Sequence, residues 1–271
     1  MRAAPLKLSR MSVRISLCLL VCWPLLAACT GEPERSLSGP VPDGPAHVEV
    51  DAVGGHAAQF DEDLAERPAG SQQEFAAATY LTGHLQRAGY EVRLESVPFK
   101  DTVRSTNVVA LTPGGGDPQA VVTVAYDTTS SAPPLGQDLG VFLELARALR
   151  VKDPDHNVEF VALGAELTIT NGGNLGSRAL ARDLQGLDDP PPVITVMVVP
   201  GGGFRAPGPM GDELNAVAAE LEVPLGRPLS VPIVPLHLKA TEIFDSAGIG
   251  HAIAAGGIEE IGMVLLEYLS R

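Results

Sequence analysis

The alternation of hydrophobic and polar positions is clearest between Gln119 and Arg150. A valine-rich apolar run that leads into Asp127 predicts a buried strand. A loop of Ser, Pro and Gly follows, and apolar residues then recur at a helical spacing, at Val141, Phe142, Leu145, Ala146 and Leu149. This pattern places Asp127 at the C-terminal end of a strand and Asp138 at the start of a helix. In open α/β sheets, ligands bind at that edge.

A second strand-to-loop unit covers residues 157–181. Apolar side chains alternate along a predicted strand, which ends at Gly164-Ala165-Glu166. We therefore expect the carboxylates of Asp127 and Glu166 to lie at the same edge of one sheet.

The remaining pattern predicts further strands and helices in alternation. Ser71 and Glu74 have the spacing of a capping box at the start of one helix, whose expected buried stripe is Phe75, Ala78, Leu81 and Leu85. Strands are predicted over residues 90–99, 107–111, 193–199, 229–234 and 250–255, and helices over 57–66, 72–88, 212–221, 241–247 and 258–269. Such alternation favours a mostly parallel, three-layer α/β fold.

The N-terminus has the features of a bacterial lipoprotein signal. Basic residues precede a short apolar run over residues 15–28, which is typical of secretory signals and short for a membrane span. Leu26-Ala27-Ala28-Cys29 resembles a lipobox, in which the cysteine carries the lipid. We expect a signal peptide over 1–28, a lipidated Cys29 with a flexible tether over 29–46, and one domain over 47–271. The alternative is an ordinary signal peptide or a weak anchor helix.

Composition narrows the possible partners. The chain has a net charge of −14, and loss of four basic residues with the signal makes it −18. Such a surface disfavours nucleic acid, and no basic patch is present in the sequence. Cys18 and Cys22 lie inside the signal and Cys29 is the expected lipid site, so the mature chain is expected to have no thiol for a disulfide or a thiolate metal site. We expect a lipid-anchored protein of the bacterial cell envelope, on the periplasmic or cell-surface side.

The order of the motifs resembles the co-catalytic di-zinc aminopeptidase family, which includes bacterial leucyl aminopeptidases and glutaminyl cyclases. The resemblance covers residues 66–271 and implies a three-layer α/β/α fold with a mixed, mainly parallel sheet. The segments that carry it are Ala125-Tyr126-Asp127, Gly136-Gln137-Asp138, Leu143-Glu144-Leu145-Ala146-Arg147-Ala148-Leu149, Gly164-Ala165-Glu166-Leu167 and Gly176-Ser177.

The metal positions implied by the resemblance are mostly lost. A zinc pair of this kind needs a histidine on each metal, a bridging carboxylate and one further carboxylate on each. Four ligand positions of the family fall on Ala125, Leu167, Val198 and Thr241. The bridging carboxylate falls on Gly136 in an alignment without gaps, or on Asp138 with a gap. Asp127 is retained without the histidine that it orients in the family.

Three functional hypotheses follow from this pattern. The first is a pseudoenzyme without a cofactor that binds a peptide or protein partner at the old cleft, with Asp127 and Asp138 as binding residues and Glu166 as a vestigial general base. The second is an active exported metallopeptidase with a relocated or mononuclear zinc site and Glu166 as general base. The third is a structural envelope lipoprotein. A relocated metal site would draw on Asp127, Asp138, Glu166, Glu242 and His237.

Overall fold

The structure, a computed structural model, describes residues 41–99, 103–130, 135–226 and 235–271, all of which belong to one compact unit, Leu37–Arg271. The signal peptide, Cys29, most of the tether and the strand expected over 229–234 lie outside the described residues. Among the residues described, no helix is both long and apolar enough to cross a membrane.

Six strands of the described chain form one sheet in the order β1-β2-β4-β3-β5-β6. Strands β4, β3, β5 and β6 are parallel, whereas β2 pairs antiparallel with both β1 and β4. The expected mixed, mainly parallel sheet is therefore confirmed. The strands are β1 (Glu91–Pro98), β2 (Arg104–Leu111), β3 (Ala120–Ala125), β4 (Val158–Leu163), β5 (Val193–Val198) and β6 (His251–Gly256).

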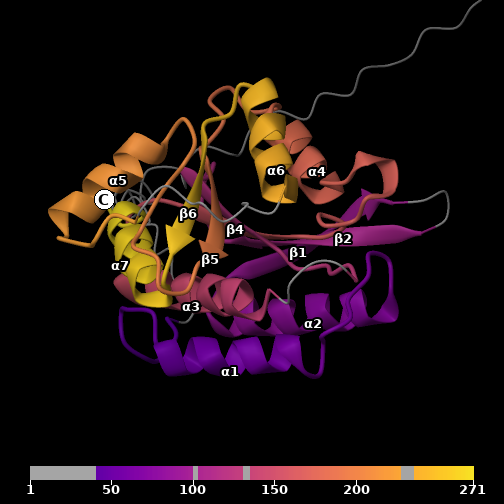
Figure 1. Cartoon of the computed structure of the whole chain (residues 1–271), viewed down its shortest axis with the longest axis horizontal. Helices are drawn as coiled ribbons and strands as arrows, with labels where there is room; N and C mark the ends of the chain where they lie inside the picture. The colour runs from indigo at the N-terminus through magenta and orange to yellow at the C-terminus, as the bar shows by residue number, and fades with distance from the viewer. Residues whose placement is uncertain (1–40, 100–102, 131–134, 227–234) are drawn as a thin grey trace, which may run out of the picture. The chain divides into compact units, whose positions relative to one another are not determined.

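Helices cover both faces of this sheet (Figure 1). Helices α1, α2, α3, α5 and α7 share one apolar core with one face of the sheet, and α4 and α6 pack on the opposite face. The alternation of side chains along β3 explains the two cores, because Val122 faces the first and Val121 the second. The helices are α1 (Val50–Asp61), α2 (Gln72–Arg87), α3 (Gly136–Lys152), α4 (Leu175–Leu184), α5 (Gly211–Glu220), α6 (Pro235–Ser246) and α7 (Ile258–Tyr268), with a short 3-10 helix at Thr170–Gly172.

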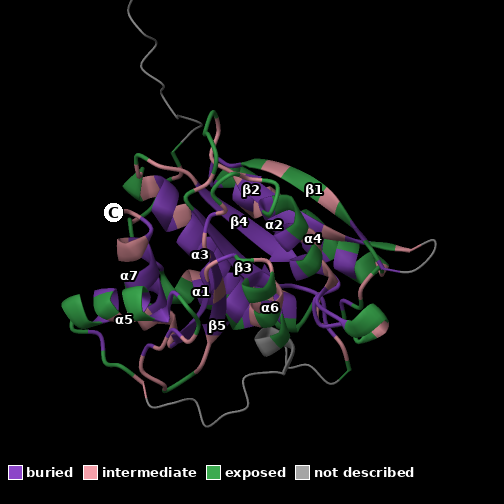
Figure 2. Cartoon of the chain, turned by 90° about the horizontal axis from the view of Figure 1, so that it is seen from above, coloured by how far each residue is buried: buried purple, intermediate pink, exposed green. Residues whose placement is uncertain are grey.

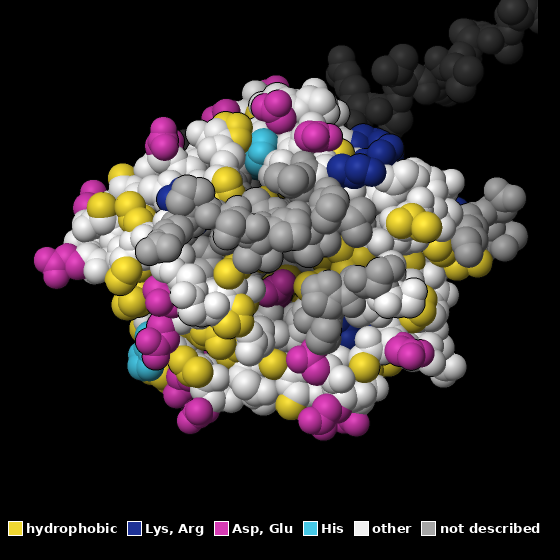
Figure 3. All heavy atoms as spheres, in the orientation of Figure 1, with side chains coloured by type: hydrophobic (Ala, Val, Ile, Leu, Met, Phe, Trp, Pro, Cys, Tyr) yellow, Lys and Arg dark blue, Asp and Glu magenta, His cyan; other side chains and the backbone are white. Residues whose placement is uncertain are grey.

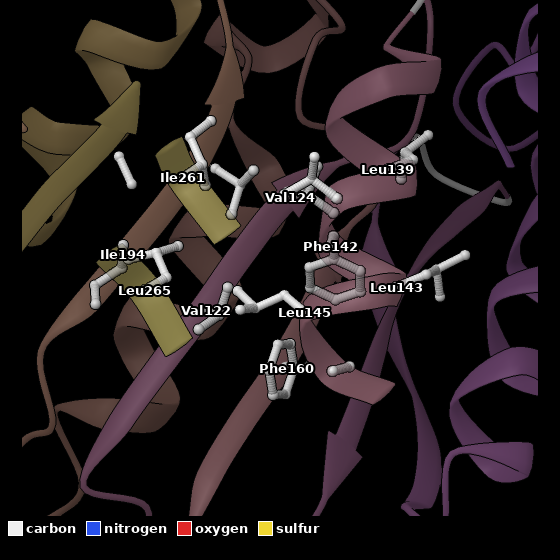
Figure 4. Close-up of a cluster of buried hydrophobic side chains, with 14 of the residues drawn as sticks. Val122, Val124, Leu139, Phe142, Leu143, Leu145, Phe160, Ile194, Ile261 and Leu265 are labelled. Atoms are coloured by element: carbon white, nitrogen blue, oxygen red, sulfur yellow. The ribbon is translucent and has the colours of Figure 1, made fainter. Parts of the chain in front are cut away.

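Helix α3 lies at the centre of the larger core (Figures 2 and 4). Phe142 packs edge-to-face on Phe160 of β4, with ring centroids 5.5 Å apart. The sequence pattern predicts one buried face for this helix, but nearly all of its residues are buried. The reason is that α1 covers its outer side. This packing fixes the start of α3, and with it Asp138, against the ends of the parallel strands.

Two expected details of the N-terminal helices are wrong. The helix predicted over 57–66 is α1 and ends at Asp61, because it begins earlier and runs through Gly54 and Gly55 to pack Val53 on the core. In α2, the Ser71 hydroxyl accepts the N–H of Glu74 at 3.0 Å, as expected. Phe75, however, is 66% exposed, and Glu74 occupies the buried position in its place.

The glycines of α1 allow a direct test of where that helix begins. We expect Gly54→Ala and Gly55→Ala each to raise the free energy of unfolding by about 0.5–1 kcal/mol, because alanine has less backbone entropy to lose in a helix. A Cβ at either position meets no atom within 4 Å. Chemical denaturation measures the change. As the matched control, Gly140→Ala in α3 should destabilise, since its Cβ would lie 2.6 Å from the carbonyl oxygen of Val53. A loss of stability in both α1 variants would contradict the helical start at Val50.

Candidate functional site

The sequence-predicted carboxylates lie together at the carboxyl edge of the parallel strands. Asp127 follows β3, Glu166 follows β4, and Asp138 stands in the first turn of α3 beside the end of β5. Their exposed fractions are 0%, 2% and 7%, so all three are buried. Each accepts hydrogen bonds from other parts of the chain, and these partners define what the site can do.

Asp127 holds the turn that follows β4. Its Oδ1 accepts the backbone N–H groups of Glu166 at 2.9 Å and Leu167 at 3.0 Å. The turn contains Ala165 in the left-handed region, with φ of 50°, a conformation that costs free energy for a residue other than glycine. Burial raises the pKa of Asp127 to about 7, against the effect of the two N–H donors, and the neighbouring charge of Glu166 raises it further. Asp127 therefore acts as a clamp inside the protein.

The Glu166 carboxylate is fully engaged. Its Oε1 accepts hydrogen bonds from Asn174 Nδ2 at 2.7 Å and from Ser177 Oγ at 2.6 Å, and its Oε2 accepts the Ser177 N–H at 2.9 Å. Ser177 stands in the first turn of α4, where backbone N–H groups need acceptors, so Glu166 binds the N-terminal end of that helix. Burial raises the pKa of Glu166 and the hydrogen bonds from Ser177 and Asn174 lower it.

Asp138 connects α3 with β5. Its Oδ1 accepts the N–H of Val198 at 2.7 Å. Val198 is the position that a metal-ligating carboxylate occupies in the resembled family, and here its backbone binds Asp138 instead. Gly136 has no room for a side chain, because a Cβ there would lie 2.6 Å from the carbonyl oxygen of Ala57. Of the two positions considered for the bridging carboxylate, only Asp138 can supply one. Burial raises its pKa to about 7, the Val198 N–H opposes this shift, and the charge of Asp61 adds to it.

Arg67 is a buried cation of the site that sequence reasoning missed. Its Nε donates to the carbonyl of Tyr126 at 2.7 Å and its Nη1 to that of Phe60 at 2.7 Å. Burial lowers its pKa to about 10, while the charges of Asp61 and Asp127 raise it. Arg67 therefore offsets part of the negative charge of Asp61 and of the buried Asp127. The one available signal was that Arg67 begins the segment Arg67-Pro68-Ala69-Gly70-Ser71, which also resembles the opening of the aminopeptidase family.

A cavity of about 670 Å³ opens above these buried groups. Its wall combines two carboxylates and several hydroxyls with apolar side chains. The lining residues are Asp61, Ala65, Glu66, Pro68, Ala69, Phe99, Thr128, Thr129, Ser130 and Thr168. Asp127, Asp138 and Glu166 are not among them. The carboxylates that reach the cavity are Asp61 and Glu66, which the sequence pattern does not single out.

The donor set does not fit a zinc pair. Within the described ranges, no group of three or more His, Cys, Asp or Glu side chains could hold a metal ion. Ala125 and Leu167 are buried apolar residues at positions where the family has ligands. Glu242 is exposed on α6, and the side chain of His237 lies outside what the structure describes.

Comparison with known proteins identifies solved structures that have a similar fold. No family model and no curated protein matches the sequence. Solved structures match over most of the chain. A glutaminyl cyclase from Tannerella forsythia has 14% identity and a TM-score of 0.64, with 83% of this chain and 99% of that one covered.

Two further solved structures agree with this result. A leucine aminopeptidase precursor from Bacteroides thetaiotaomicron has 16% identity and a TM-score of 0.61, with coverage of 86% and 99%. A Zn-dependent exopeptidase from Parabacteroides distasonis has 16% identity and a TM-score of 0.57, with coverage of 86% and 100%. The chain has the zinc-aminopeptidase-like fold, as the motif order predicts.

Proposed function

We propose that this protein is a lipoprotein of the cell envelope, anchored at Cys29, whose aminopeptidase-like domain binds a peptide or a protein segment without cleaving it. One observation carries the proposal. The carboxylates at positions that resemble the catalytic site of the aminopeptidase family are tied to internal donors, while a cavity remains above them. A volume of about 300–1,000 Å³ is typical of ligand sites in proteins.

The hydrogen bonds of Glu166 argue against its use as a base. A general base must reach the water or substrate from which it takes a proton. Both carboxylate oxygens of Glu166 accept hydrogen bonds from Ser177 of α4 or from Asn174, the residue just before that helix. Glu166 does not line the cavity. For catalysis it would have to give up these bonds, which leaves buried donors unpaired at a cost of about 1–3 kcal/mol each.

The surface supports a peptide or protein ligand over nucleic acid. Figure 3 shows Asp and Glu side chains spread over the visible face, with few Lys or Arg. The net charge of −14 repels phosphate backbones at long range. The cavity wall instead offers carboxylates, hydroxyls and apolar contacts, which suit the mixed chemistry of a peptide.

Peptide binding can be tested with one blocking variant. A peptide library is screened by thermal shift against the purified protein, and we expect a subset of peptides to raise the melting temperature. Thr129→Trp fills the cavity and should abolish the shift. Gln119→Trp is the control, because Gln119 is exposed just before β3, at the opposite edge of the sheet. If no peptide raises the melting temperature, the third hypothesis, a purely structural lipoprotein, is favoured.

The alternative is an exported metallopeptidase with a relocated or mononuclear zinc site. It is tested by the zinc content of the protein after incubation with zinc and desalting, together with the hydrolysis of aminoacyl-anilides. We expect almost no bound zinc and no hydrolysis. One or two tightly held zinc ions with activity would overturn the proposal. In that case Glu166→Gln should abolish activity and leave the zinc in place.

A further inference from the structure

A second cavity, of about 370 Å³, lies among helices α1, α2 and α3 and the segment of residues 41–43. It shares no lining residue with the cavity above the carboxylates. Its walls carry four groups that can bear positive charge, in a protein that is strongly acidic overall. These groups are His56 of α1, His84 and Arg87 of α2, and Arg147 of α3.

Arg147 is already saturated. Its guanidinium binds both carboxylate oxygens of Glu144, at 2.9 to 3.1 Å, and the backbone carbonyls of Pro45 at 2.9 Å and His47 at 2.8 Å. Glu144 is therefore paired with Arg147, although its charge still raises the pKa of His56. The remaining carboxylate of the wall, Asp43, is exposed to solvent, where its field is screened.

The side chains of the other three groups have hydrogen-bond donors to spare. Arg87 is exposed, and neither its guanidinium nor the His84 ring makes a hydrogen bond or ion pair with any described residue. His56 Nδ1 shares a hydrogen bond of 2.8 Å with the Tyr80 hydroxyl, which leaves its Nε2 available. The rings of His56 and His84 are close, with centroids 4.6 Å apart.

Burial and the neighbouring cationic groups lower the pKa of both histidines. Burial lowers the pKa of His84 to about 4, and the neighbouring His56 and Arg87 lower it further. The pKa of His56 is also lowered, by burial first and by Arg87, against the effect of Glu144. Three groups that can bear positive charge thus meet at one cavity, and none of them forms an ion pair with a described residue.

We propose that this cavity is a binding site for a phosphate group, held by Arg87, His56 and His84. A phosphate offers three acceptor oxygens in a tetrahedral arrangement, which suits donors that come from two different helices. The planar guanidinium is a strong phosphate donor. The cavity is larger than a phosphate group alone requires, so an organic substituent fits beside it.

The phosphate can belong to a soluble ester or to a lipid headgroup. Residues 41–43 line the cavity and continue the segment that leads from Cys29. Inorganic phosphate and the soluble short-chain lipid dihexanoyl phosphatidic acid distinguish these sources, because they share the phosphate group and differ in the lipid part.

The test is calorimetric titration of the full chain, purified in detergent, with each of the two probes at matched ionic strength. We expect at least one probe to bind, and Arg87→Gln to weaken its affinity by about tenfold or more, the size of a charge-assisted hydrogen bond. The control is Arg182→Gln on α4, because Arg182 is exposed and α4 packs on the opposite face of the sheet. This control should bind like the wild type.

A second measurement follows the pKa of His84 directly. Sulfate keeps its charge between pH 3 and 8, so it is the probe for a titration of His84 by NMR. The charged or titratable groups that face His84 are Asp43, His56, Tyr80, Arg87, Glu144 and Arg147. We expect bound sulfate to raise the pKa of His84 from about 4 by at least one unit.

Each outcome decides the proposal. Binding of phosphatidic acid alone that Arg87→Gln weakens supports a headgroup site, and binding of both probes supports a general phosphate site. Binding of neither probe overturns the proposal. So do equal effects of Arg87→Gln and Arg182→Gln, or a His84 titration that sulfate leaves unchanged.

Discussion

Replacing Asp127 by alanine is expected to lower the free energy of unfolding by about 2–5 kcal/mol. The carboxylate is fully buried and accepts the N–H groups of Glu166 and Leu167. Each N–H left without an acceptor costs about 1–3 kcal/mol. The same bonds hold Ala165 in its left-handed conformation, so their loss also releases the turn after β4. Urea denaturation at pH 5, where the wild-type carboxyl is protonated, measures the loss without a contribution from a buried charge.

Two controls isolate the role of the oxygen atom. Asp127→Asn keeps Oδ1, which accepts both N–H groups, and should lose less than half as much stability as the alanine variant. Asp189→Ala removes an exposed carboxylate and should change stability by less than about 0.5 kcal/mol. Equal stability of Asp127→Ala and Asp127→Asn would show that the two N–H groups have other acceptors.

The protein is expected to lose stability as the pH rises from about 4 to 7. The pKa values of Asp127, Asp138 and Glu159 are raised to about 7, in each case chiefly by burial. Between their unfolded and folded pKa values the folded state binds more protons, so the free energy of unfolding falls with pH. Each such group contributes about 1.4 kcal/mol per pH unit.

Histidines with a lowered pKa have the opposite effect on the free energy of unfolding over part of this pH range. The pKa of His84 is lowered to about 4 in the folded state. The folded state therefore binds fewer protons at this ring, and the resulting stability is present above the unfolded pKa of 6.5 and is lost as the pH falls towards 4. Three carboxyls with large shifts outweigh it, so the net slope stays negative. Denaturant unfolding at half-unit intervals from pH 4.5 to 7.5 measures the slope. A free energy of unfolding that rises throughout this range would contradict the burial of these carboxyls.

The variant Asp138→Asn isolates the contribution of one carboxyl group to the pH dependence of stability. Asparagine retains an oxygen for the Val198 N–H and cannot ionise. We expect little change at pH 5 and a gain of about 1–2 kcal/mol at pH 8, where the wild type must bury a charge or keep a proton at a cost. The same change at both pH values would show that Asp138 titrates as an ordinary carboxyl.

The sequence pattern located most elements because their periodicity is local. The strand expected over 193–199 is β5, and the helix expected over 258–269 is α7, each within about one residue at either end. Errors arose where tertiary packing outweighs propensity. Two glycines hid the start of α1, which packing on α3 stabilises, and a buried Glu74 displaced Phe75 from the core. Helix α4 was missed because the acceptor for its first turn is Glu166, which binds the N–H and the hydroxyl of Ser177 from the end of β4.

The sequence by itself determined the order of most elements, the zinc-aminopeptidase-like fold and the absence of metal-binding side chains at Ala125 and Leu167. Side-chain identity is enough for such conclusions, because alanine and leucine cannot bind zinc. Only the tertiary structure decided what the retained carboxylates do. Asp127 meets a partner 39 residues away, and Asp138 one 60 residues away. Arg67 and the cavity walls likewise combine segments that are distant in the chain, and only folding brings their donors and acceptors within bonding distance.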